Sequence, residues 1–204
     1  MAKKKTNPKK IPIAADSFDP KQIIFDATNR MVLRGWGLVL GALADFKGTT
    51  TESLLRLWDA VNAYSSSIHD YDDVEDELKR IEKIADISIP FERVFFSHIK
   101  TQGDLDRFIR KTYQNALYSA FAIMANPIIE EKLLCEDDIA HVFRKAYDLE
   151  EEINEGRIAF EDIQDMLKEE YDLQLYADEH GQAVLHVRSD FDGVPLDRST
   201  TYQT

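Results

Sequence analysis

The sequence predicts a mainly α-helical protein in which two degenerate three-helix repeats pack together, with a small C-terminal β-hairpin. Three observations lead to this fold class. Apolar residues recur at helical spacing along most of the chain. A shift of 85 residues aligns the two halves without a gap. Two alternating runs near the end, DLQLYA and AVLHV, flank a glycine-containing turn, which is typical of a hairpin.

The composition changes along the chain and sets the expected domain boundaries. Five lysines lie within the first ten residues, where no hydrophobic periodicity is visible. We therefore expect a disordered basic arm at residues 1–17, a first helical repeat at 18–90 and a connector at 91–103. The second repeat with its hairpin is expected at 104–188, followed by a frayed tail at 189–204.

In the first repeat, capping residues mark the expected helix starts. Asp19 as N-cap and Pro20 at the first helical position begin the first helix, which should end near Gly48. Thr49-Thr50-Thr51-Glu52 is a capping box for the second helix. A break at residues 69–72 precedes a shorter acidic helix, and ADISIP then forms a β-like segment stopped by a proline. The spacing Gly37-x-x-x-Gly41 should let the first helix approach a neighbour closely.

The connector and the second repeat have their own expected boundaries. Residues 91–103 are apolar, and we expect a short helix there before a turn at Gly103. Helical spacing resumes at Asp104, and Pro127 should end or kink that helix. Another helix is expected from about Glu136 to Ile153, and a short one follows the next turn.

The 85-residue shift pairs side chains of similar size. Gly35 meets Ala120, and the large residues Trp36 and Trp58 meet Phe121 and Phe143. We interpret this register as a duplication. The four large residues, Trp36, Trp58, Phe121 and Phe143, are accordingly expected in or beside the core where the repeats meet.

Residues 151–167, EEINEGRIAFEDIQDML, resemble the end of a calcium loop and its following helix. With Gly156 at the sixth position of an EF-hand template, Ile153 falls on a ligand position, where it cannot coordinate a hard cation. The sequence therefore favours a plain turn between two helices. In this turn Gly156 adopts a positive φ and Ile158 covers the core.

The charge of the chain, −13, restricts its partners. An acidic surface repels nucleic-acid phosphates, so we expect no direct nucleic-acid binding by the body and favour a basic protein partner. The longest apolar run is about half the ~20 residues that span a bilayer, and no membrane contact is expected. A single cysteine, Cys135, is typical of a reducing cytoplasm. The sequence leaves a homo-oligomer open.

The segment YDLEEEINEGRIAFEDIQDMLKEEYDLQL and the helix before it resemble small uncharacterised helical proteins carried by prophages and integrative elements of Gram-positive bacteria. The likeness covers roughly residues 106–175. The resemblance implies a mobile-element accessory protein, and it supplies no site residues.

No catalytic, cofactor or metal site is expected. Asp137 and His141 share a helical face, but two potential ligands do not make a metal site. Cys135 lacks a predictable histidine partner, His98 is expected to pack in an apolar patch, and Asp190-Phe191-Asp192-Gly193 lies in the expected tail. A metal-dependent enzyme, the least favoured alternative, would need His69 and His141 or neighbouring acids to converge.

The favoured hypothesis is a non-enzymatic protein–protein interaction module that presents acidic helices to its partner. The second is an inhibitor that mimics DNA and blocks a host defence nuclease or another nucleic-acid enzyme. Both use the same candidate acidic surface, in two groups along the chain: Asp70, Asp72, Asp73, Glu75, Asp76 and Glu77, then Glu150, Glu151, Glu152 and Glu155. A continuous acidic stripe would favour mimicry, and scattered acids would favour the plain module.

Overall fold

The computed structural model describes residues 19–46, 48–68, 70–95, 97, 99–130, 134–178 and 182–187. These residues form six helices and one two-stranded antiparallel sheet, which confirms a mainly helical fold with a small C-terminal hairpin. The elements are α1 (Pro20–Ala44), α2 (Thr51–Ser65), α3 (Tyr71–Ala85), α4 (Gln102–Glu130), α5 (Glu136–Asn154), α6 (Phe160–Tyr171), β1 (Leu173–Ala177) and β2 (Ala183–Val187). The basic arm at 1–17 and the expected tail at 189–204 lie outside the described residues.

Side-chain caps fix the starts of the helices in the first half. The carboxylate of Asp19 accepts a hydrogen bond from the backbone N–H of Lys21 at 2.9 Å, as an N-cap does. Thr50 and Ser53 exchange side-chain and backbone hydrogen bonds at the start of α2, which confirms a capping box. Asp70 caps α3 by accepting from the backbone of Asp72 and Asp73.

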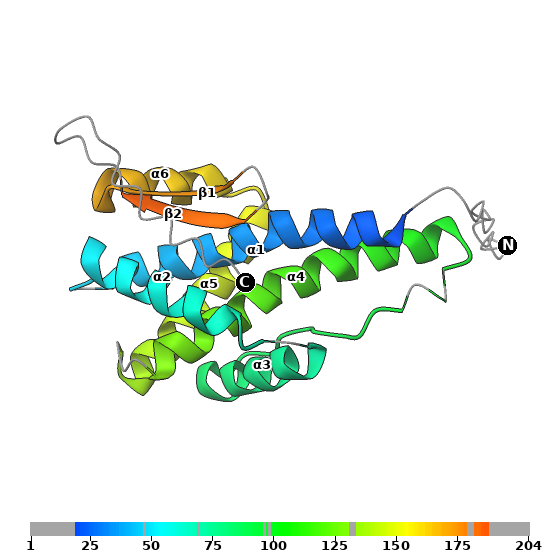
Figure 1. The fold of residues 1–204 in the computed structure, drawn as a ribbon, viewed down its shortest axis with the longest axis horizontal. Helices are drawn as coiled ribbons and strands as arrows, with labels where there is room; N and C mark the ends of the chain where they lie inside the picture. Colours follow the sequence, from blue (N-terminus) through cyan, green and yellow to red (C-terminus); the bar gives the residue numbers. More distant parts are fainter. Residues whose placement is uncertain are drawn as a thin grey trace, which may run out of the picture.

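Helices α1 and α4 form the centre of the molecule. Both begin at the same end of the molecule and run in the same direction, side by side (Figure 1). They approach closely at Gly35, where an added Cβ would lie 2.6 Å from Ala120 Cβ and 2.8 Å from the carbonyl oxygen of Leu117. The two residues that meet at this crossing are therefore the pair that the 85-residue shift aligns.

Each central helix packs against outer helices of the other half. Helix α1 contacts α5 and α6, whereas α4 contacts α2 and α3. A Cβ added to Gly37 would lie 2.6 Å from the ring of Phe160, and one added to Gly41 would lie 2.8 Å from Ile163, both on α6. The expectation that these glycines permit a close helix approach is confirmed. In the other half, Asn126 of α4 donates a hydrogen bond to Glu77 of α3.

Aromatic pairs fill the core on both sides of the crossing. Trp36 and Trp58 meet edge to face with ring centroids 5.0 Å apart, and Phe121 and Phe143 lie 6.5 Å apart. All four side chains are buried, at 7%, 6%, 0% and 0% exposure respectively, as the sequence predicts. The two ring pairs are related by the same 85-residue shift.

The two acidic helices α3 and α6 lie on opposite sides of the central pair (Figure 1). Both end at an aspartate in the left-handed conformation, Asp86 with φ of 52° and Asp172 with φ of 56°. An extended segment follows each one. After α6 this segment is β1, whose Leu175 pairs with Leu185 of β2. After α3 it runs unpaired towards α4, where Asn115 bonds to the backbone of Glu92.

The order of elements and the reciprocal helix contacts agree with two copies of one unit, and the duplication itself stays a prediction. In the connector, residues 91–95 and 99–100 have no regular secondary structure; only residue 97 is helical, as part of a 3-10 turn whose neighbours 96 and 98 lie outside the described residues, so the expected short helix stays a prediction there. This segment lies along α4 and gains backbone hydrogen bonds from it. Helix α4 does not end at Pro127 but continues to Glu130.

Candidate interaction surface

The first group of candidate acids lies at the start of α3, and most of its carboxylates have a partner. Asp72 forms an ion pair with Arg93 of the connector. Lys79 pairs with Glu75 at 2.9 Å and with Asp76 at 3.5 Å. Asp70 and Asp73 exchange the capping hydrogen bonds of the helix. Ion pairing within α3 therefore offsets much of the negative charge of this group.

Glu77, also in the first group, faces the interior of the fold. Its carboxylate accepts a hydrogen bond from the Tyr64 hydroxyl at 3.0 Å and another from Asn126. Burial and this hydrogen bond to Glu77 raise the pKa of Tyr64 to about 12. Glu77 thus joins α2, α3 and α4 and does not belong to an exposed surface.

Glu150, in the second group, was assigned to an exposed surface, and the structure corrects this assignment. It is only 8% exposed and accepts a hydrogen bond from Arg34 Nε at 2.8 Å. Asn154 bridges the two side chains, donating to Glu150 at 3.0 Å and accepting from Arg34 at 3.2 Å. The network ties α5 to α1 and leaves Glu150 unavailable to a partner.

The rest of the second group lies where α5 turns towards α6. Glu151 and Glu155 are exposed, and Arg157 pairs with Glu152 and Glu155. Gly156 has φ of 71°, and Ile158 packs against the core, as expected for a plain turn between helices.

The first group belongs to α3, whereas Glu150, Glu151 and Glu152 belong to α5 and Glu155 follows it. Helices α3 and α5 pack against each other, but among the described residues no hydrogen bond or ion pair joins an acid of one group to an acid of the other.

Helix α6 carries an exposed acidic face that the sequence analysis missed. This face, called the α6 face below, consists of Glu161, Asp162, Asp165, Glu169 and Glu170. All five side chains are exposed, and none forms an ion pair with a described Lys or Arg. Asp162 accepts a capping hydrogen bond from the Ala159 backbone at 2.7 Å. The i, i+4, i+8 spacing of Glu161, Asp165 and Glu169 is the sequence signal that identifies such a face.

The carboxylates of the α6 face, counted without the charge of Lys168, are spaced about as densely as the phosphates of one nucleic-acid strand. Helix α6 has 12 residues, so it is about 18 Å long at 1.5 Å per residue. Five carboxylates over this length correspond to about one charge per 3.6 Å, and one strand of B-DNA carries about one per 3.4 Å. Lys168, also exposed, removes one charge from the face.

Groups suited to metal or nucleophilic chemistry are dispersed in the described part of the chain. No cluster of three or more His, Cys, Asp or Glu side chains able to hold a metal ion occurs in that part. The ring of His141 packs against that of Phe46, with ring centroids 5.3 Å apart. The Cys135 thiol donates a hydrogen bond to the Asp138 carboxylate at 3.0 Å. His69, His98 and residues 190–193 lie outside the described residues.

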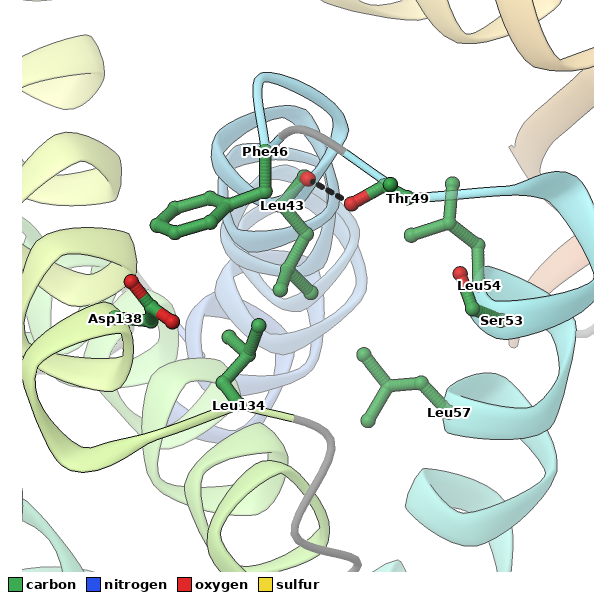
Figure 2. Close-up of a pocket in the computed structure, with 9 residues that line it drawn as sticks. Leu43, Phe46, Thr49, Ser53, Leu54, Leu57, Leu134 and Asp138 are labelled. Atoms are coloured by element: carbon green, nitrogen blue, oxygen red, sulfur yellow. Dashed lines mark hydrogen bonds between the residues drawn. The ribbon is translucent and has the colours of Figure 1, made fainter.

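A largely apolar cavity of about 290 Å³ opens where α1 ends and α2 and α5 begin. Leu43, Leu54, Leu57 and Leu134 point towards one another around it, and Asp138 lies at its edge (Figure 2). Thr49 on its wall donates its hydroxyl to the carbonyl of Leu43 at 2.8 Å. The leucines contribute contact area and no reactive group.

Within the described residues, no helix combines the length and hydrophobicity needed to cross a bilayer. Comparison of the chain with protein-family models, with curated proteins and with solved structures found no match.

Proposed function

We propose that the protein is a non-enzymatic binding protein that presents the α6 face to a basic surface on a protein partner. The observation that carries this proposal is the absence of ion pairs on the α6 face among the described residues, in contrast to α3. Carboxylates without a partner cost little to bring against Lys or Arg side chains, because no internal ion pair has to break first. We extend the proposal to the biological context that the prophage resemblance implies, an accessory protein of a mobile element.

Neutralisation of the α6 face tests the proposal. In the variant Glu161→Gln/Asp165→Asn/Glu169→Gln, affinity for a basic partner captured from host lysate should fall about tenfold or more, because complementary charges across the interface are lost. The matched control, Asp72→Asn/Glu75→Gln/Asp76→Asn on α3, changes the net charge equally and should keep most of the affinity. Affinity can be measured by surface plasmon resonance. Equal losses in both variants would show that overall charge, and not the α6 face, directs binding.

A second candidate function, competition with DNA for a basic groove, is favoured by the charge density of the α6 face. If the partner binds nucleic acid, a 20-base-pair duplex should compete with this protein and displace it from the partner. The affinity of the complex should also fall steeply as the salt concentration rises, as counterion release requires. If the partner stays bound at saturating duplex, it uses a surface other than its DNA groove, and the plain interaction module stands.

A further inference from the structure

A cleft that the proposed function does not use is formed mainly by the first half of the chain and closed on one side by the hairpin. It has a volume of about 340 Å³ and lies between α1, the end of α2 and the start of β2. Its walls include Asn29, Leu33 and Trp36 on α1, Asn62 and Ser65 on α2, and Gln182 before β2. The cleft is separate from the cavity in Figure 2, which shares none of these residues.

In the second half, larger side chains occupy the equivalent positions. The 85-residue shift places Tyr118, Tyr147 and Glu150 at the positions of Leu33, Asn62 and Ser65. The Tyr118 and Tyr147 rings stack with centroids 6.5 Å apart and an interplanar angle of 5°, and Glu150 bonds to Arg34. Tyr118 is 4% exposed, and burial raises its pKa. The first half therefore has an open cleft where the second half has a filled polar core.

The cleft has unusual chemistry for this chain, in which 31% of residues are charged. Its walls carry no charged side chain among the described residues. The carboxamides of Asn29, Asn62 and Gln182 make no hydrogen bond to another described side chain or backbone group; Asn62 and Gln182 are exposed at the mouth of the cleft, and Asn29 is half-buried. Ser65 donates its hydroxyl to the Asn62 carbonyl at 2.8 Å. The cleft therefore offers carboxamides that remain available to a ligand.

One buried donor beside the cleft is also unsatisfied. Trp36 is 7% exposed, and its indole N–H has no hydrogen-bond partner within the described structure. A buried donor without an acceptor destabilises the fold. Trp36 also lines the cleft, although its indole N–H itself is inaccessible to solvent and is not counted as a contact for a ligand.

We propose that this cleft binds a small uncharged heterocycle with donor and acceptor groups on one edge, the chemistry of a nucleobase or nucleoside. A carboxamide pairs one donor with one acceptor, which matches the edge of a base such as adenine. The cleft volume lies within the usual range for small-ligand sites. The absence of charge on its walls favours an uncharged ligand over a nucleotide phosphate. This inference is independent of the α6 face.

Titration of the full-length protein with adenosine, guanosine, cytidine and uridine tests the inference. At least one nucleoside should bind at sub-millimolar concentration in calorimetry. It should also change the tryptophan fluorescence, since both tryptophans of the chain lie in this half and contact each other. No heat and no fluorescence change up to about 10 mM would overturn the inference. Equal binding of glucose, which is uncharged but has no planar edge, would also overturn it.

Two variants copy the second half and locate the site. Asn62→Tyr introduces the residue found at position 147, which should fill the cleft and weaken nucleoside binding at least about tenfold. The matched control Ala63→Tyr places the same side chain on the adjacent exposed position of α2 and should bind as the wild type does. Trp36→Phe, measured by calorimetry, should weaken binding because it replaces the indole that lines the cleft with a smaller ring. Unchanged affinity in Asn62→Tyr, with a wild-type melting temperature, would overturn the assignment.

Discussion

Replacing Gly35 with valine is expected to lower the free energy of unfolding by about 3 kcal/mol. The new Cβ would lie 2.6 Å from Ala120 Cβ and 2.8 Å from the carbonyl oxygen of Leu117, closer than van der Waals contact allows. The carbonyl belongs to the backbone of α4 and cannot rotate away, so the two central helices must separate. The gain in helix propensity from removing a glycine is under about 1 kcal/mol and does not offset this cost. Urea unfolding followed by circular dichroism measures the difference.

Gly103 provides the matched control for this substitution. It also lies in a helix, the first turn of α4, but an added Cβ would meet nothing closer than Thr101 Oγ1 at 3.9 Å. Gly103→Val should therefore change stability by no more than about 0.5 kcal/mol. If Gly35→Val were as mild as this control, α1 and α4 would not cross closely at Gly35.

Replacing Phe121 with alanine is expected to cost about 3–5 kcal/mol of stability, the usual range for a buried phenylalanine. The side chain is 0% exposed, and the centroid of its ring lies 6.5 Å from that of Phe143 and 5.9 Å from that of Tyr118. Its removal leaves a cavity between α4 and α5 that the surrounding rings cannot fill without leaving their own contacts. Thermal and urea unfolding should both report the loss.

Phe25→Ala tests whether this cost comes from burial. Phe25 lies in the first turns of α1 and is 55% exposed, so its removal should change stability by about 0.5 kcal/mol or less. Similar losses in the two variants would mean that Phe25 is covered, or that Phe121 does not lie in the core.

Local chemistry made the helices and their register predictable. Asp19, Thr50 and Asp70 cap helices by their own side chains, so a short stretch of sequence identifies each start. The alignment of Gly35 with Ala120 predicted which residues are equivalent, and the structure places the two in contact. Long-range packing decides which outer helices each central helix contacts. No local pattern in the sequence predicts these contacts.

The errors at the candidate surface have different causes. Glu150 lies seven residues after buried Phe143, which places both on the same helical face, so its inward position could have been derived from helical periodicity. The acids of the α6 face are three to four residues apart along much of the helix. Runs of consecutive acids stand out more in a sequence, but such runs are typical of helix starts and turns. The conformation of the irregular connector could not be predicted from local sequence. It depends on hydrogen bonds to Asn115, which is over 20 residues away along the chain.

The central claim is that two equivalent units meet at the parallel crossing of α1 and α4, and that each central helix packs against outer helices of the other unit. This arrangement places α3 and α6 on opposite sides of the central pair. It also leaves one cleft open. Nuclear Overhauser contacts in protonated protein labelled uniformly with ¹³C and ¹⁵N test it most directly. The claim predicts a strong contact between the Ala120 methyl and the Gly35 α-protons, together with contacts from the Phe160 ring to Gly37. Contacts of Gly35 to α2 or α3 in place of Ala120 would contradict it.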